Sequence, residues 1–187
     1  MRLKQGIPRH FRKPEGAEQP NSGFIAGLMQ MYAYCNAWGK VAVEVGSAAG
    51  ESAEIALHFV GHLYCVDPWH NSKNESLFDQ RVGNSVRMTK MKMFSHEAAE
   101  QFENKSLDLV YIDGGHNYEN VSRDIRCWFP KIKPGGWITG HDYDELERHV
   151  DVVRAVDEVF WDLVVSFPDS SWAVQVTSTS LPIFPRG

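Results

Sequence analysis

The sequence lacks long apolar runs, paired cysteines and any excess of positive charge. No stretch approaches the roughly 20 apolar residues that a membrane-spanning helix needs, and the polar start MRLKQGIPRH lacks the apolar core of a signal peptide. The cysteines, Cys35, Cys65 and Cys127, form neither a CxxC pair nor an even set, which predicts reduced thiols. We therefore expect a soluble, cytoplasmic protein without a membrane partner.

The formal net charge of -5 offers no broad basic surface, so nucleic acid is not expected as the main partner. A small basic cluster at residues 9–13 could still contact an anion. A chain of 187 residues is expected to form a single domain. No repeat or low-complexity segment divides it, and a homodimer is left open.

Three segments are expected along this domain. Residues 1–20, rich in Pro, Gly and charge, are expected to form an arm or lid. Residues 21–38 predict a helix, because apolar side chains recur there at helical spacing: Phe24, Leu28, Met31, Cys35 and Trp38. Residues 40–187 are expected to form the core, with the polar stretch 70–90 as a second candidate lid.

In the core, apolar runs alternate with helical patterns, which predicts a parallel α/β sheet. The expected strands are VAVEV, HLYCVD, MKMF, LDLVYID and WITGHD, the last of them following a turn at Pro134-Gly135-Gly136. The final runs, LVVSF and WAVQV, are separated only by PDSS, which suits an antiparallel hairpin. Five parallel strands and a hairpin are therefore predicted.

Two of these strands end in groups that carry chemistry. LDLVYID leads into Asp113 and His116, and WITGHD ends in His141 and Asp142. Parallel strands joined by a crossover helix end at the same sheet edge, where open α/β sheets bind ligands. We expect these carboxylates and imidazoles to meet there.

The first strand leads into a glycine turn, with Glu44, Gly46 and Gly50 at the start of a helix. The spacing does not match G-x-G-x-x-G, so it does not specify a pyrophosphate site. Asp67 follows 21 residues after Gly46, close to the offset of a ribose-binding carboxylate, although it could simply stabilise a turn. Trp69 could pack on an adenine face or anchor the surface.

Here the chain resembles the class I S-adenosylmethionine (SAM)-dependent methyltransferases, whose first motif is similar to EVGSAAG. The resemblance implies a Rossmann-like three-layer sandwich with a seven-stranded, mostly parallel sheet in the order 3-2-1-4-5-7-6. The segment DGGHNYENVSRDIRCWFPKIKPGGWITGHDY resembles small members with Asp-Gly-x-His and Gly-His-Asp motifs. The family resemblance also implies which residues contact the cofactor: Glu44, Gly46, Ser47 and Gly50 for methionine and ribose, Asp67 for ribose, and Ser95, His96 and Glu97 for adenine.

Metal-dependent O-methyltransferases are similar in placing ligand carboxylates after strands four and five, here Asp113 and Asp142. Such a site would hold Mg²⁺ or Mn²⁺ and polarise the substrate oxygen. In those families an Asn or Asp follows the second carboxylate, whereas this chain has Tyr143, with Asp144 one residue later. Carboxylates that bind substrate or backbone without a metal are the open alternative.

His116 is the candidate general base, because an imidazole titrates near neutral pH. It could instead bond the loop or cap the helix that begins near Asn117. His141 is expected to point away from Asp142 and to act as a supporting contact. The remaining histidines considered receive no role: His58, His62, His70 and His149.

The resulting expectation is a SAM-dependent methyltransferase that acts on a hydroxyl of a small molecule or sugar. One alternative is a non-catalytic module that binds SAM or a nucleotide. A more distant alternative is an NAD(P)-dependent oxidoreductase, which the missing G-x-G-x-x-G pattern disfavours.

Overall fold

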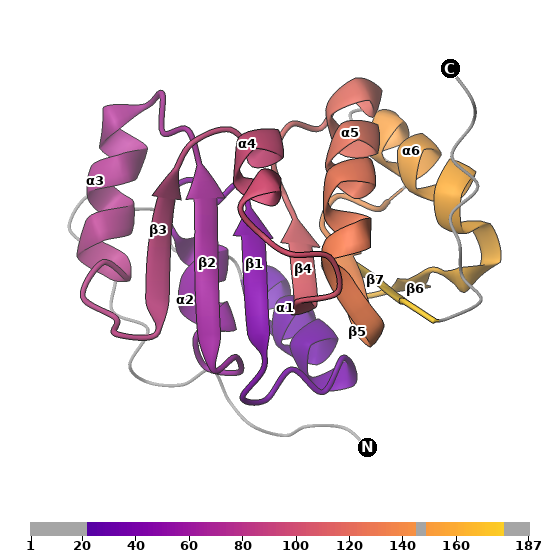
Figure 1. The fold of residues 1–187 in the computed structure, drawn as a ribbon, viewed down its shortest axis with the longest axis horizontal. Helices are drawn as coiled ribbons and strands as arrows, with labels where there is room; N and C mark the ends of the chain where they lie inside the picture. Colours follow the sequence, from indigo (N-terminus) through magenta and orange to yellow (C-terminus); the bar gives the residue numbers. More distant parts are fainter. Residues whose placement is uncertain (1–21, 145–148, 178–187) are drawn as a thin grey trace.

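The computed structural model describes residues 22–144 and 149–177, which share one seven-stranded sheet. Its strand order is β3-β2-β1-β4-β5-β7-β6, as predicted (Figure 1). The parallel strands are β1 (Val41–Val45), β2 (His62–Asp67), β3 (Met88–Lys92), β4 (Leu107–Ile112) and β5 (Ile132–Gly140). The hairpin of β6 (Val165–Ser166) and β7 (Trp172–Gln175) adds antiparallel to β5.

Helices cover both faces of the sheet. Side chains of α1 (Ser22–Tyr34), α2 (Glu51–Ala56) and α3 (Ser72–Arg81) belong to one core cluster. Those of α4 (Ser95–Glu100), α5 (Tyr118–Trp128) and α6 (Val150–Phe160) belong to the other. Short 3-10 turns follow at η1 (Phe129–Lys131) and η3 (Trp161–Leu163). The three-layer sandwich is therefore confirmed.

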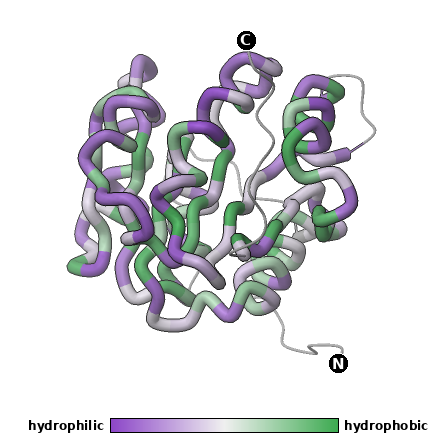
Figure 2. Tube along the Cα trace, turned by 45° about the vertical axis from the view of Figure 1, so that its right-hand side comes forward, coloured by the Kyte–Doolittle hydropathy of each residue, from purple (hydrophilic) through white to green (hydrophobic). Residues whose placement is uncertain are grey.

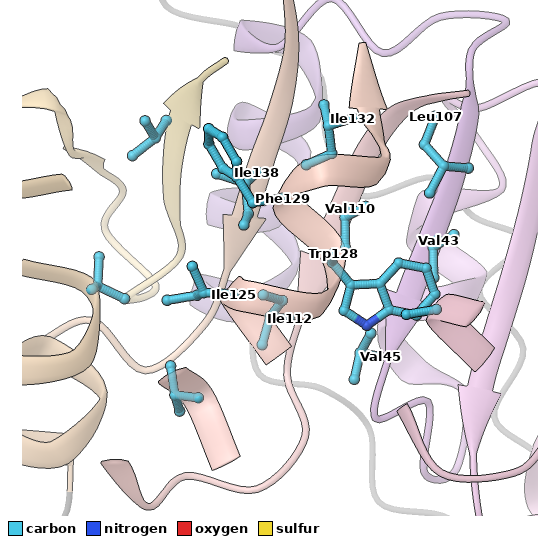
Figure 3. Packing of buried hydrophobic residues seen from close by; sticks show 14 of the residues in the cluster. Val43, Val45, Leu107, Val110, Ile112, Ile125, Trp128, Phe129, Ile132 and Ile138 are labelled. Carbon is cyan, nitrogen blue, oxygen red and sulfur yellow. The ribbon is translucent and has the colours of Figure 1, made fainter. Parts of the chain in front are cut away.

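The central strands read as continuous apolar runs because both of their faces are covered. In β1, Val43 and Val45 belong to the core under α4, α5 and α6, whereas Ala42 belongs to the opposite core. Figure 3 shows the first of these cores, where the Trp128 indole lies close to Val43 and Val45. Figure 2 shows hydrophobic residues along the central strands and hydrophilic residues on outward helix turns.

The polar stretch 70–90 contains the helix α3, which the sequence did not predict, while its role as a lid stays a prediction. Asn71 caps this helix by accepting from the backbone N–H groups of Lys73 and Asn74. One fully buried residue, Phe78, anchors it against the Trp69 ring, with centroids 4.7 Å apart. A single apolar anchor gives too weak a periodic signal for a helix to be predicted from sequence.

Other boundaries also differ. Strand β5 begins at Ile132 and passes through the expected turn at residues 134–136, where its pairing with β4 shifts register. Trp38 lies beyond the end of α1 and is 60% exposed, so it is not part of the buried stripe. The expected arm at residues 1–20 lies outside the described residues. Within the described ranges, no helix has the length and apolar character needed to cross a membrane.

Candidate functional site

The glycine turn after β1 brings two chain segments into direct contact. Gly46 has φ +89°, and its N–H donates to the Val66 carbonyl at 2.8 Å. A Cβ at this position would lie 2.1 Å from the Asp113 carbonyl oxygen, which no real side chain could tolerate. Glycine is therefore required where the ends of β1 and β4 meet.

Asp67, at the end of β2, stabilises this turn. Its Oδ2 accepts from the Ala48 N–H at 3.0 Å, and its Oδ1 accepts from the Trp69 N–H at 2.6 Å. The residue also lines a cavity of about 680 Å³, within the usual size of ligand sites. Asp67 therefore stabilises a turn, which was the alternative to ribose binding, and its contact with a ribose stays a prediction.

Trp69 supports the turn from within the protein. It is 4% exposed, its indole N–H donates to the Ala48 carbonyl at 2.8 Å, and it is not part of the cavity wall. The Lys90 ammonium lies 4.9 Å from its ring centroid. Phe78 and Lys90 lie against its ring, which matches the anchoring alternative, while packing of Trp69 on an adenine face stays a prediction.

The other predicted cofactor contacts divide between the cavity wall and its surroundings. Gly46, Ser47, Asp67, Ser95 and His96 line the cavity, whereas Glu44, Gly50 and Glu97 do not. Glu97 accepts from the Phe94 N–H at 3.1 Å and so caps α4. Glu44 is fully buried, and burial raises the pKa of its carboxyl to about 7.

The second half of the site gathers around Asp142. Its Oδ2 lies 3.2 Å from His116 Nε2, and its Oδ1 lies 3.1 Å from both His141 Nδ1 and His149 Nε2. Asp113 approaches His116 from β4, with Oδ1 3.8 Å from Nε2. The ends of β4 and β5 thus bring the carboxylates and imidazoles together, as the parallel crossover predicts.

The expectation that His141 points away from Asp142 is wrong. Strand alternation no longer applies there, because β5 ends at Gly140 and Asp142 adopts a left-handed φ of +61°. This backbone turn brings the two neighbouring side chains to 3.1 Å.

Sequence reasoning missed His149, which is 5% exposed and precedes α6. Its Nδ1 lies 2.7 Å from Asp144 Oδ1, and its Nε2 contacts Asp142. Its only sequence signal is a spacing of seven residues from Asp142, which is not a recognised ligand pattern.

The charges around Asp142 shift several pKa values. The carboxylates of Asp113 and Asp142 raise the pKa of His116 against its partial burial. Burial opposes protonation of His141, but Asp142 and Asp113 outweigh it and raise its pKa. Burial also opposes ionisation of Asp142, yet the neighbouring imidazoles hold its pKa below its usual value. Asp142 is therefore a carboxylate surrounded by proton donors.

A subset of this cluster has the donor types of a metal site. One ligand atom each from Asp113, His141 and Asp142 lie within 4.8 Å of one another. Two carboxylates and an imidazole fit a divalent ion, although Asp142 already contacts three histidines. The imidazole favours Mn²⁺ over Mg²⁺, which prefers oxygen ligands.

A second cavity, of about 440 Å³, adjoins this cluster. His141, Asp142 and His149 line it together with residues of the β6–β7 turn. Phe24 of α1 belongs to the walls of both cavities, and its ring meets His141 edge-on at 5.3 Å. The histidine–aspartate cluster therefore lies between two spaces that could hold two reactants.

The sheet order, the glycine turn and the paired cavities define a protein with the Rossmann-like methyltransferase fold. A family profile described as "Methyltransferase domain" matches residues 43–143, more than half of the 187 residues. The chain belongs to this methyltransferase-domain family.

Two curated relatives are similar in sequence. Uncharacterized protein y4gI of Sinorhizobium fredii is 28% identical over 123 residues, covering 57% of this chain and 13% of the relative. Uncharacterized protein R132 of Acanthamoeba polyphaga mimivirus is 25% identical over 134 residues, covering 65% of this chain and 59% of the relative. The chain thus spans less than two thirds of either curated relative.

Solved structures share the fold at low identity. A Corynebacterium glutamicum protein has a TM-score of 0.63 at 14% identity, covering 87% of this chain and 84% of that chain. A SAM-dependent O-methyltransferase from Thermotoga maritima has a TM-score of 0.57 at 13% identity, covering 80% and 64%. Phosphoethanolamine N-methyltransferase 1 of Haemonchus contortus, solved with S-adenosylhomocysteine, has a TM-score of 0.54 at 13% identity, covering 67% and 28%.

Proposed function

We propose that this chain is a SAM-dependent methyltransferase that methylates a hydroxyl of a small molecule or sugar. The observation that carries the proposal is the position of His116 and Asp142 between two cavities, one of them beside the glycine turn and Asp67. Membership of the methyltransferase-domain family supports the reaction class. Structural neighbours that use SAM support the cofactor.

SAM, when bound, would supply a methyl group to an acceptor oxygen by in-line displacement, in which the C–O bond forms as the C–S bond breaks and S-adenosylhomocysteine leaves. The larger cavity would hold the cofactor, with the Gly46 turn allowing close approach of the backbone and Asp67 accepting from ribose hydroxyls. The smaller cavity, bordered by Phe24, would hold the acceptor. Alignment of the two reactants is the main contribution that a protein makes to such a displacement.

His116 would remove the proton from the acceptor hydroxyl. Its Nε2 faces Asp142 Oδ2 at 3.2 Å, so we assign the Nε2–H as donor to that carboxylate. Nδ1 is then left as the proton acceptor, and Asp142 stabilises the imidazolium that forms. His149 and His141 hold Asp142 through its other oxygen.

A metal would add Lewis-acid polarisation of the acceptor oxygen, and Asp113, His141 and Asp142 are the residues that would hold it. Calorimetric titration with Mn²⁺ tests this part, with Asp142→Asn as the variant expected to weaken binding. Undiminished turnover after EDTA treatment, with no heat from Mn²⁺, would favour the metal-free arrangement.

The decisive experiment supplies pure protein with SAM and a panel of hydroxylated small molecules and sugars. Release of S-adenosylhomocysteine above background, dependent on one acceptor class, is expected. Stabilisation by S-adenosylhomocysteine without turnover on any acceptor would favour a non-catalytic binding module. Thermal stabilisation by NAD(P) but not by SAM or S-adenosylhomocysteine would overturn the proposal.

A further inference from the structure

One carboxylate in the wall of the larger cavity has no place in the mechanism above. Asp124, on α5, is 4% exposed and lines the cavity, and its Oδ1 has no hydrogen-bond partner among the described residues. Burial raises the pKa of its carboxyl. A buried polar atom without a partner costs free energy, so its position in a cavity wall indicates that a ligand supplies the partner.

Asp124 lies one helical turn before Trp128 on α5, which packs against α4. The Trp128 indole N–H donates to Ser95 Oγ at 2.8 Å, and an indole nitrogen can only donate. The Trp128 ring is fully buried among the side chains of Figure 3, and Ser95 lines the same cavity as Asp124. The carboxyl of Asp124 therefore belongs to the part of the cavity wall that α4 and α5 form.

The other carboxylates of the cavity already have partners. Glu51 pairs with Arg81 at 2.9 Å, and Asp67 accepts from two backbone N–H groups. Asp113 faces His116. Asp124 forms no ion pair within the described ranges, and the neighbouring Arg123 guanidinium donates to Asn120 instead. Asp124 is thus the acceptor that remains for a ligand.

Its place in the cavity indicates which part of a ligand it meets. Asp124 lines the larger cavity together with Ser95 at the start of α4, whereas His116 faces Asp142 beyond β5. Resting on the proposed cofactor, we propose that Asp124 is a specificity-determining residue that accepts a hydrogen bond from the exocyclic amine of the adenine ring. A base with a carbonyl oxygen in place of that amine would bring its oxygen against the Asp124 carboxylate. Both groups are hydrogen-bond acceptors, so we expect such a base to bind more weakly.

Direct binding tests the inference without any turnover. The affinities of S-adenosylhomocysteine and of S-inosylhomocysteine, which has oxygen in place of the amine, are measured by calorimetry. The wild-type protein is expected to prefer the adenosine compound by about tenfold or more, the usual effect of one hydrogen bond to a charged group. Asp124→Asn is expected to lower that ratio at least about tenfold, since its amide can donate to the inosine oxygen.

A matched control is Glu119→Gln, which removes an exposed carboxylate from the same helix and lies outside the cavity wall. It should leave the ratio unchanged, whereas a purely structural role of Asp124 would weaken both ligands equally. Equal affinity of the wild-type protein for the two compounds would overturn the inference even if Asp124→Asn failed to fold. Failure of the wild-type protein to bind either compound would instead count against the proposed cofactor.

Discussion

At the scale of single residues, His116 derives its proposed chemistry from neighbours that are distant in sequence. The sequence places it three residues after Asp113, but the closer carboxylate is Asp142 at 3.2 Å. That contact directs one imidazole nitrogen toward the protein and leaves the other for a substrate.

His116→Gln is expected to lower methyl-transfer turnover about 100-fold or more, because general-base catalysis typically contributes 10²–10⁴-fold. Affinity for S-adenosylhomocysteine should change little. Turnover and calorimetric binding measure the two effects, and His58→Gln, an exposed position outside both cavities, is the control. Unchanged turnover in His116→Gln would exclude His116 as the base.

Gly46→Ala is expected to destabilise the fold more than Gly135→Ala. Both glycines have positive φ, so each alanine carries the backbone penalty of about 1–2 kcal/mol. Only at Gly46 would the added methyl clash, 2.1 Å from the Asp113 carbonyl, while nothing lies within 4 Å at Gly135. Urea unfolding compares the two variants, and equal losses would show that the clash relaxes freely.

At the scale of elements, the turn between β1 and α2 is held by the last residue of β2 and by a residue just after it. Asp67 and Trp69 contact the two sides of Ala48, accepting from its N–H and donating to its carbonyl. α3 adds a further support, because Arg81 pairs with Glu51 and Glu54 of α2. The conformation of the glycine turn therefore depends on packing by β2 and α3 as well as on its glycines.

Trp69→Phe is expected to reduce stability by about 1 kcal/mol, because it removes the donor to the Ala48 carbonyl and keeps most of the ring packing. S-adenosylhomocysteine affinity should fall by a few fold as the turn loosens. Thermal unfolding and calorimetry check both effects, with the exposed Trp38→Phe as control. Loss of binding with unchanged stability would instead support direct contact between Trp69 and the cofactor.

At the scale of the whole molecule, the buried Glu44 links global stability to pH. Burial raises the pKa of its carboxyl from 4.5 to about 7 in the folded protein. Folding then favours the protonated form, so stability is full below about pH 4.5 and falls as pH rises through about 7. The loss amounts to roughly 3 kcal/mol at 1.36 kcal/mol per pKa unit.

Glu44→Gln is expected to remove this contribution, so that its unfolding free energy declines less between pH 5 and pH 8 than that of the wild-type protein. Urea titrations of both proteins at several pH values, without ligand, measure the difference. Glu119→Gln, an exposed position, should keep the wild-type slope. Parallel pH profiles for Glu44→Gln and the wild-type protein would show that Glu44 titrates normally.

Much of the architecture could be predicted from sequence because strands buried on both faces leave continuous apolar runs. β1 and β2 begin and end where VAVEV and HLYCVD do, and the short PDSS link predicted the antiparallel hairpin. α3 was missed because its burial rests on Phe78 alone. The extension of β5 through a Pro-Gly-Gly segment was missed because a register shift accommodates it.

The residues of the sequence determined five parallel strands, a terminal hairpin, the glycine turn and the meeting of Asp113 with Asp142, because local patterns and parallel crossovers dictate these features. The order of the strands in the sheet was expected from the family resemblance. Only the tertiary structure decided the partners of Asp142, since no local sequence pattern indicates that His149 contacts it. Likewise, the sequence pattern indicates only that Asp124 is an acidic residue on an amphipathic helix. Packing of α5 against α4 turns it into a buried acceptor at a cavity wall.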